Sequence, residues 1–336
     1  MKLDTALAPS TLNEVPALAR AIEAVGFDAV WTAETSHDPY LPLALIAEHT
    51  QRLKFGTSIA VAFPRSPLVH AQIAWDLQAQ SNGRFMLGLG TQVKGHNERR
   101  FGIRWESPGP RLREMILTIR AIWDCWQHGT RPSFEGQHYR FTLMTPFFNP
   151  GPIAHPKIPI YIAGVNPFMC QLAGELCDGL HIHPLHSMRY LHHCLLPEVQ
   201  QGLAKSGRSR ADLTLSTSAF VITGTNDEEI DRAKQAIRMQ IAFYASTRTY
   251  SRVLAMHGWE EVGTRLNEQV AKGDWSAMGR EITDEMLETF AVVGRYDDIA
   301  DKVKAKYAGV LDRVGFYLPY RPTDEAHWRP IVRAFT

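Results

Sequence analysis

Short apolar runs of strand composition alternate with amphipathic stretches along the whole chain, and this alternation constrains the fold more than any other feature. Eight such runs can be distinguished, and several are apolar almost throughout. A continuous apolar run is typical of a strand in a parallel sheet whose two faces are both covered. We predict strands over Leu3–Leu7, Ala29–Ala33, Leu53–Val61, Phe85–Leu89, Pro159–Ala163, Leu180–His183, Leu213–Thr223 and Val314–Leu318.

Helix signals lie between these runs. Residues 112–126 place their apolar side chains on one face of a helix. Residues with a side-chain oxygen favour the N-cap, proline favours the first helical position, and glycine favours the end of a helix. The boundaries that we predict on this basis are an N-cap at Asn13, a helix end at Gly26, helix starts at Ser66-Pro67 and Asn166-Pro167, and a capping box of Thr225 with Glu228.

Eight strands in alternation with helices predict a (β/α)8 barrel, or TIM barrel, formed as a single domain by residues 1–336. The alternative is a doubly wound sheet that binds a dinucleotide, which requires GxGxxG directly after a strand. Gly88-Leu89-Gly90 follows a predicted strand but has no third glycine at that offset. Two stretches exceed a normal barrel connection. We expect a hairpin-like insertion over residues 129–156 and extra helices over residues 245–289, before the last barrel strand.

Composition argues against several classes of protein. The formal net charge is +1, so no field attracts nucleic acid or an anionic membrane. No apolar run approaches the ~20 residues of a membrane span, and the N-terminus lacks the pattern of a signal peptide. We therefore predict a cytoplasmic protein. Four cysteines lack metal-binding spacing and are predicted to be reduced, buried thiols, namely Cys125, Cys170, Cys177 and Cys194.

The loop after the second predicted strand contains a candidate acid/base pair. In such barrels the chemistry occurs where strands end and the following loops begin. Glu34 and His37 lie in this position. A histidine titrates near neutrality, and a nearby carboxylate can orient it. The pair could therefore move a proton, although an ordinary loop histidine is an equally open interpretation.

The loop after the fifth predicted strand has the properties of an anion site. It is made of small residues and leads directly into a helix, whose free N–H groups and positive dipole end favour an anion. A cofactor phosphate would fit, and an ordinary tight turn is the alternative. The candidate contacts are Ala163, Gly164, Val165 and Asn166.

Two histidines on the sixth predicted strand raise the question of a metal. His181 and His183 are two residues apart, so their side chains face the same side of the strand. The ends of the first and last strands, at Pro9 and Tyr320, supply no further ligand of the kind that a metal hydrolase needs. We predict no metal, with one histidine lining the pocket and the other filling the barrel.

Several motifs together resemble the bacterial-luciferase-like superfamily of luciferase-like monooxygenases, and within it the F420-dependent oxidoreductases. They are Gly56–Ile59, Arg65–Pro67, Ser81–Phe85 and Gly88–Gly90, and the resemblance covers nearly the whole chain. It implies a bulged third strand with a non-prolyl cis peptide at Ser58-Ile59, a phosphate-binding loop from Gly164 to Pro167, and a catalytic loop after the second strand. It also implies a homodimer.

One departure from these relatives concerns the catalytic loop. F420-dependent relatives often place an acidic residue and a histidine consecutively there. In this chain Thr35 follows Glu34, and His37 comes two residues later, before Asp38. Either Glu34 or His37 could therefore be the acid/base.

The resemblance implies coenzyme F420, with FMN as the alternative, because the two share a tricyclic ring, a ribityl chain and a phosphate. F420 also has an acidic tail, which basic groups at the rim could meet; the alternative is a solvated charged face. The rim candidates are Arg65, Lys94, Arg99 and Arg100. The expected cofactor contacts are Ser58, Ile59, Gly90, Thr91, Ala163, Gly164, Val165 and Asn166.

The implied activity is hydride transfer between the deazaflavin and a small organic substrate. Aromatic residues and one histidine near the predicted strand ends would form the substrate pocket, namely Trp31, Phe63, Trp105 and His183. A two-component monooxygenase that uses reduced FMN is one alternative. A barrel that binds a cofactor without turnover is the alternative from another class of protein.

Overall fold

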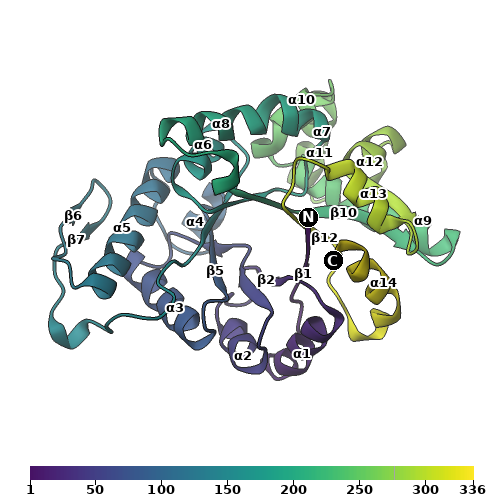
Figure 1. The fold of residues 1–336 in the computed structure, drawn as a ribbon. Coiled ribbons are helices and arrows are strands. Elements are labelled where there is room, and N and C mark those ends of the chain that lie inside the picture. The colour runs from purple at the N-terminus through teal and green to yellow at the C-terminus, as the bar shows by residue number, and fades with distance from the viewer. Residues whose placement is uncertain (276) are drawn as a thin grey trace.

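The computed structural model describes residues 1–275 and 277–336. Eight parallel strands close into a barrel with helices around it, which confirms the predicted TIM barrel (Figure 1). Each strand pairs with the next in the ring, and β12 pairs with β1 to close it. In ring order the strands are β1 (Lys2–Ala6), β2 (Ala29–Thr32), β3 (Lys54–Thr57), β5 (Phe85–Gly90), β8 (Ile160–Gly164), β9 (Gly179–Ile182), β10 (Thr214–Gly224) and β12 (Arg313–Phe316).

The predicted strands agree with the observed ones except at their ends and at two other places. The predicted strand Leu53–Val61 is divided into β3 and β4 (Ala60–Val61) around a bulge. The strand β11 (Ala291–Arg295) was missed; it pairs with the last part of β10 as an additional edge strand. A short apolar run such as this one cannot be distinguished from a helix segment by periodicity alone.

Helices follow most barrel strands and cover the outside of the barrel. The longer ones are α1 (Val15–Val25), α2 (Leu41–His49), α3 (Pro67–Gln80), α5 (Pro108–His128), α6 (Pro167–Leu176), α8 (Leu196–Lys205), α9 (Asp227–Ala245), α11 (Glu260–Lys272), α13 (Ile299–Tyr307) and α14 (Glu325–Phe335). The shorter ones are α4 (Lys94–Arg99), α7 (Met188–Tyr190), α10 (Ser251–Ala255) and α12 (Asp284–Phe290). Within the residues that the structure describes, no helix is both long and apolar enough to cross a membrane.

The predicted helix boundaries are partly confirmed. Ser66 and Asn166 are N-caps whose side chains accept the N–H three residues on. Gly26 ends α1 with a φ of 104°, in the left-handed region that favours glycine.

Two predicted helix caps are wrong. The N-cap of α1 is Glu14 rather than Asn13, because a 3-10 turn over Leu12–Glu14 runs directly into the helix. Asn226 caps α9 in place of Thr225, because its Oδ1 reaches the N–H of Glu229 at 2.9 Å. Thr225 instead donates its hydroxyl proton to the Glu229 carboxylate.

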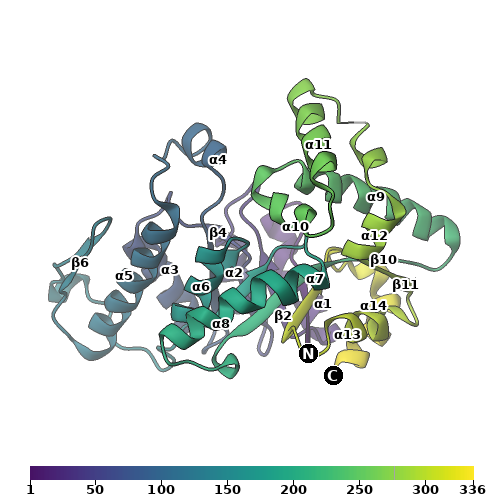
Figure 2. The ribbon, with the colours of Figure 1, turned by 90° about the horizontal axis from the view of Figure 1, so that it is seen from above.

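The two long connections contain the elements expected of them. In residues 129–156 the strands β6 (Phe134–Glu135) and β7 (Arg140–Phe141) form an antiparallel hairpin. The helices α10, α11 and α12 occur between residues 245 and 290. Figure 2 shows α4 and α11 at the end of the barrel opposite the two chain termini. That end holds the C-terminal ends of the strands and is called the mouth below.

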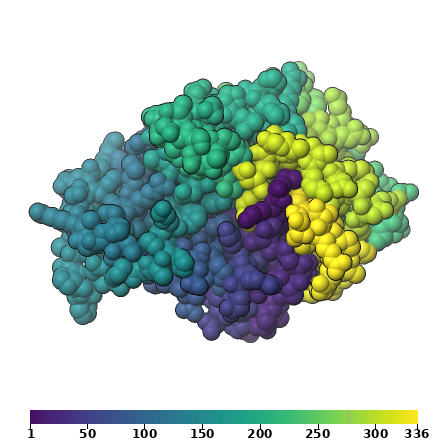
Figure 3. Space-filling model, in the orientation of Figure 1, coloured from purple at the N-terminus to yellow at the C-terminus, as the bar shows by residue number. Residues whose placement is uncertain are grey.

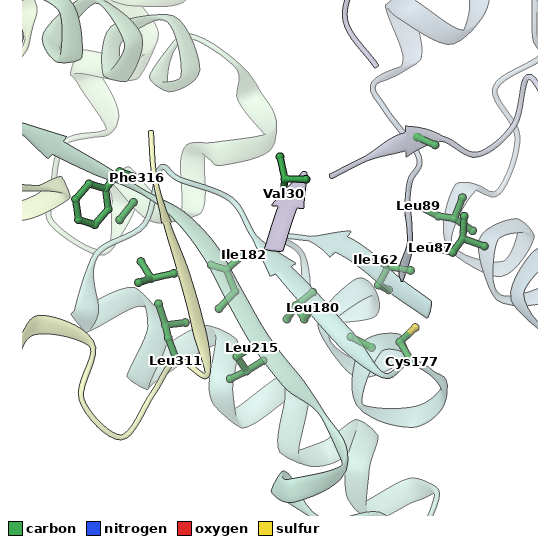
Figure 4. Close-up of a cluster of buried hydrophobic side chains, with 14 of the residues drawn as sticks. Val30, Leu87, Leu89, Ile162, Cys177, Leu180, Ile182, Leu215, Leu311 and Phe316 are labelled. Carbon is green, nitrogen blue, oxygen red and sulfur yellow. The ribbon is translucent and has the colours of Figure 1, made fainter. Parts of the chain in front are cut away.

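Side chains of β2 divide between two apolar clusters. Val30 of β2 belongs to the large cluster between strands and helices, where Leu180 of β9 and Leu215 of β10 also lie (Figure 4). Ala29 and Trp31, on the other face of β2, form a separate cluster with Met86 and Tyr161 inside the barrel. This alternation follows from the two-residue period of a strand. The four cysteines are free, as predicted, and all but the half-buried Cys194 are buried.

Candidate active site

The end of β3 carries a non-prolyl cis peptide between Ser58 and Ile59, as the family resemblance predicts. Beyond it, β4 runs beside β5 with Val61 opposite Gly90. A Cβ atom at position 90 would lie 2.7 Å from the side chain of Ile59. Because glycine has no Cβ atom, it leaves the space that the Ile59 side chain occupies. Both residues of the cis peptide are half-buried, so the bulge offers a partly exposed surface at the mouth.

The loop between β8 and α6 is fixed by two hydrogen bonds. The Asn166 side chain accepts the N–H of Met169 at 3.0 Å, and the Tyr190 hydroxyl donates to the carbonyl of Val165 at 2.5 Å. Asn166 itself is exposed, and Val165 is half-buried. Pro167 has no N–H and the Met169 N–H is already bonded, so the Phe168 N–H and the positive dipole end of α6 are what this loop offers to an anion.

These two segments lie close together in the barrel. β5 pairs with β4 on one side and with β8 on the other. Two strand spacings place the bulge and the start of α6 about 10 Å apart. The bulge offers a half-buried surface with apolar and hydroxyl groups, and the helix start favours an anion. Together they suit a flat ring with a phosphate-bearing chain. The residues present therefore fit a cofactor of the F420 or FMN type.

A buried asparagine fixes the loop after β5. The amide of Asn97 donates to the carbonyls of Thr91 at 2.9 Å and Val93 at 3.1 Å. Thr91 is half-buried beside the bulge. Sequence analysis assigned no role to Asn97, and nothing in its local pattern distinguishes it from an ordinary helix residue.

Glu34 and His37 do not form the predicted pair. The Glu34 carboxylate accepts the N–H of Val61 at 2.7 Å and two N–H groups of Arg65 at 2.9 and 3.1 Å. His37 is exposed, and its ring makes no hydrogen bond or ion pair with any residue that the structure describes. The carboxylate is thus engaged with β4 and Arg65, and it does not orient the imidazole.

Arg65 has a different role from the predicted one. Its guanidinium also binds Asp38 at 2.7 Å, and its side chain is only 17% exposed. Asp38 in turn accepts the N–H groups of Tyr40 and Leu41 at the start of α2. Arg65 is therefore committed to carboxylates of the loop after β2 and is not available at the rim for a cofactor tail.

A tyrosine–histidine pair lies beneath this network. The Tyr40 hydroxyl is 2.8 Å from Nδ1 of His70, and Nε2 of His70 is 2.9 Å from the carbonyl of Ala62. Burial lowers the pKa of His70 to about 4, so the ring is neutral near pH 7. A neutral ring that donates from Nε2 to the carbonyl accepts the Tyr40 proton at Nδ1.

The other rim candidates lie in α4 or directly after it. Lys94 is exposed and lies 4.0 Å from Glu98. Arg99 is exposed, and Arg100 donates to the carbonyl of Thr35 in the loop after β2. These side chains lie near the mouth, where Figure 2 places α4.

Trp31 lies inside the barrel, so its predicted place in the substrate pocket is wrong. Its indole N–H donates to Asp4 at 2.9 Å, and its ring contacts those of Tyr161 and His181. The Asp4 carboxylate also binds Arg313 at 2.6 and 2.8 Å. Trp31 therefore fills the barrel beneath the mouth, because its position on β2 points inward.

Phe63 and Trp105, two of the residues predicted for the substrate pocket, lie against each other. Their rings meet edge to face with centroids 6.4 Å apart. The guanidinium of Arg111 lies over the Phe63 ring, 4.5 Å from its centroid. Phe63 is buried and Trp105 is half-buried, so Trp105 is the more accessible of the two.

His183 belongs to an aromatic wall that sequence analysis did not detect. Its ring stacks on Tyr250 at 4.1 Å and meets the edge of Tyr244 at 4.4 Å. The hydroxyls of Tyr244 and Tyr317 are 2.6 Å apart. Burial lowers the pKa of His183 to about 3, so the wall carries no charge on this ring near pH 7. Tyr250 comes from the 245–289 insertion, and no local motif marked it.

His181 lies inside the barrel, apart from this wall. Its Nδ1 is 2.9 Å from the hydroxyl of Ser216, and its Nε2 is buried with no hydrogen-bond partner in the described chain. Burial lowers its pKa to about 3. No group of three or more His, Cys, Asp or Glu side chains that could hold a metal occurs among residues 1–275 and 277–336.

Comparison with known proteins gives close relatives in bacteria and archaea. An uncharacterised protein of Mycobacterium tuberculosis is 47% identical over 314 residues, which cover 94% of this chain and 92% of that protein. The 5,10-methylenetetrahydromethanopterin reductase of Archaeoglobus fulgidus is 32% identical over 297 residues, which cover 86% of this chain and 85% of the reductase.

A solved structure and a family model extend this result to the fold and the family. The coenzyme F420-dependent tetrahydromethanopterin reductase of Methanopyrus kandleri superposes with a TM-score of 0.81 at 21% identity, covering 99% of this chain and 97% of that one. The model of the luciferase-like monooxygenase family matches residues 2–313. Members of this family are oxidoreductases and monooxygenases. The chain described here belongs to the luciferase-like monooxygenase family.

Proposed function

We propose that the protein is an F420-dependent oxidoreductase that transfers a hydride between the deazaflavin and a small organic substrate. The observation that carries the proposal is the half-buried bulge between β3 and β4, two strand spacings from the start of α6. A putative coenzyme F420-dependent oxidoreductase of Mycobacterium tuberculosis, 32% identical over 301 residues, supports F420 over FMN. When bound, the deazaflavin would donate or accept the hydride.

The chain supplies two kinds of contact to this cofactor. The ring would lie against the bulge and the end of β5, at Ser58, Ile59, Gly90 and Thr91. The phosphate would meet the β8–α6 loop at Ala163, Gly164, Val165 and Asn166. The exposed cations of α4 would meet the acidic tail, because they retain few partners of their own.

We assign the proton transfer that accompanies the hydride to His37. All three hydrogen bonds of the Glu34 carboxylate are bonds that it accepts, from Val61 and Arg65. An imidazole titrates near neutrality and can give or take a proton at a ring nitrogen. The His37 ring is exposed and unengaged, so it can reach a substrate heteroatom. Glu34 then holds the loop against β4 as a positioning residue.

The substrate would enter between two aromatic groups at the mouth. Trp105 with Phe63 borders one side, and His183 with Tyr250 borders another. Apolar rings exclude water from a hydride-transfer site and offer no charged group that would bind a charged substrate. A small, largely uncharged organic molecule fits this lining.

A binding experiment tests the proposal. Purified protein is titrated with F420 and, separately, with reduced FMN, and binding is followed by fluorescence. We expect saturable F420 binding that Gly90→Val weakens strongly, because the added side chain would enter the space of Ile59. Circular dichroism checks that the variant is folded. Binding of neither cofactor would remove the proposal, and binding of FMN alone with oxygen uptake would favour a monooxygenase.

Two further expectations remain predictions at this stage. The family resemblance implies a homodimer, which sedimentation equilibrium of the purified protein would measure. A cytoplasmic location was predicted from composition, and fractionation of the source cells would measure it.

A further inference from the structure

A cavity lies at the end of the barrel opposite the mouth. Its volume is about 310 Å³, and its lining residues lie at or next to the first residues of the barrel strands. The N-terminal and C-terminal segments meet on this face, as Figure 3 shows. Trp31 and Tyr161, whose rings are 5.5 Å apart, fill the barrel between this cavity and the mouth. The cavity is therefore separate from the candidate active site.

The carboxylates that line the cavity already have cationic partners. Asp178 binds Arg120 at 3.2 Å, and Asp312 binds Arg210 at 2.7 Å. Each also accepts a backbone N–H, from Ile160 and Leu215 respectively. The negative charge at this end of the barrel is thus largely compensated.

The lysines that line the cavity have no such partners. The side chains of Lys2 and Lys54 make no hydrogen bond or ion pair with any part of the chain that the structure describes. Burial, followed by the nearby charges of Lys2 and Arg313, lowers the pKa of Lys54. Arg84 donates only to backbone carbonyls and a threonine hydroxyl. The charges of Asp28 and Asp4 act on the pKa of Lys54 in the opposite direction. Asp28 accepts the N–H of Leu3, and Asp4 is bound to Arg313.

We propose that this cavity binds a small molecule bearing a dianionic phosphate group, held by the ammonium groups of Lys2 and Lys54. An ammonium is a compact charge that binds phosphate without demanding a planar partner. Such an anion would relieve the repulsion between the two lysines. The cavity holds roughly ten times the ~30 Å³ that a water occupies, so there is room for a phosphate monoester as well as for free phosphate. Tyr161 and Thr214 offer hydroxyl groups on the inner wall.

Calorimetric titration with inorganic phosphate and with glycerol 3-phosphate, at ionic strength held constant with potassium chloride, tests the proposal. We expect saturable binding that weakens by about tenfold or more in Lys2→Gln/Lys54→Gln, since two charged hydrogen bonds are lost. The matched control is Lys234→Gln/Lys272→Gln, which removes the same charge from positions of α9 and α11 outside the cavity lining and should leave the dissociation constant unchanged. Tighter binding of glycerol 3-phosphate identifies a monoester as the ligand, and equal binding identifies free phosphate.

The mouth is the competing location for phosphate, so the titrations are repeated with FMN or F420 present. Phosphate binding that survives the double lysine substitution and is displaced by the cofactor would overturn the proposal. Absence of saturable binding of either probe would also overturn it. Cofactor binding itself should be equal in the wild type and both double variants, so this result is independent of the proposed redox function.

Discussion

At the scale of single residues, the Glu34 carboxylate determines the arrangement of the loop after β2. It joins that loop to β4 through Val61 and to Arg65, and Arg65 extends the link to Asp38. Both ends of the Glu34–Arg65 pair are largely buried, with exposures of 7% and 17%. Removing one member of such a pair is costly, because the other charge is then buried without a partner.

Arg65→Met should therefore lower the free energy of unfolding by about 2–4 kcal/mol, because a buried carboxylate is left without its cation. Urea denaturation followed by circular dichroism measures the change. Arg99→Met is the matched control, because Arg99 is exposed and has no ion-pair partner among the described residues, and it should contribute less than about 0.5 kcal/mol. The double variant Glu34→Gln/Arg65→Met should recover part of the loss. Strictly additive effects would mean that the pair contributes nothing.

His37 is expected to matter for turnover and not for stability. His37→Ala should reduce the turnover number by about 10²–10⁴-fold with a substrate found by panel screening, because general acid–base catalysis contributes on this order. Its melting temperature should be unchanged, since the side chain is exposed without partners in the described structure. His192→Ala, at an exposed position of the segment after α7, is the control. Unchanged turnover in His37→Ala would transfer the acid/base role to another residue.

At the scale of elements, two helices of this barrel share the same start and differ in their proposed role. α3 begins with Ser66-Pro67 and α6 with Asn166-Pro167, and in each helix the cap side chain accepts an N–H three residues on. Only α6 follows the barrel strand next to the bulged pair of β4 and β5. Comparing the two helices therefore distinguishes the effect of an N-cap on stability from its effect on the proposed anion binding.

Asn166→Ala and Ser66→Ala should each lower the free energy of unfolding by about 1 kcal/mol, the usual contribution of an N-cap. Only Asn166→Ala should also weaken F420 binding, because only α6 would hold the phosphate. Thermal unfolding and fluorescence titration measure the two quantities on the same samples. Equal F420 affinity in both variants would contradict the phosphate site at α6.

At the scale of the whole molecule, buried neutral histidines from several elements predict sensitivity to acid. Burial lowers the pKa of His70 and His186 to about 4 and of His181 and His183 to about 3. In the unfolded chain these rings titrate near 6.5, so the unfolded state binds more protons as pH falls below that value. Their contribution to stability is complete above pH 6.5 and is lost progressively down to about pH 3–4.

Unfolding measured in urea between pH 7 and pH 5 should show this loss. Each buried histidine contributes a slope of up to about 1.4 kcal/mol per pH unit below its unfolded pKa. His70→Gln should therefore reduce the slope by about one proton, whereas His192→Gln at an exposed position should leave it unchanged. A slope that His70→Gln does not alter would mean that this ring is protonated in the folded protein.

The sequence determined the barrel, the position of the cis peptide and the N-capped loop that leads from β8 into α6. These features depend on local patterns: apolar runs of strand length, N-cap and proline pairs, and motifs shared with a family. The same local patterns misassigned two helix caps by one residue, because neighbouring polar residues compete for the same N–H groups.

Tertiary structure alone decided which side chains meet at the mouth. Arg65 became the partner of Glu34 because β4 runs past the loop after β2, and Trp31 turned inward because its strand position faces the barrel axis. Tyr250 reaches His183 from an insertion 67 positions further along the chain. Such contacts join residues distant in sequence, and their geometry follows from the closure of the barrel, which no local pattern encodes.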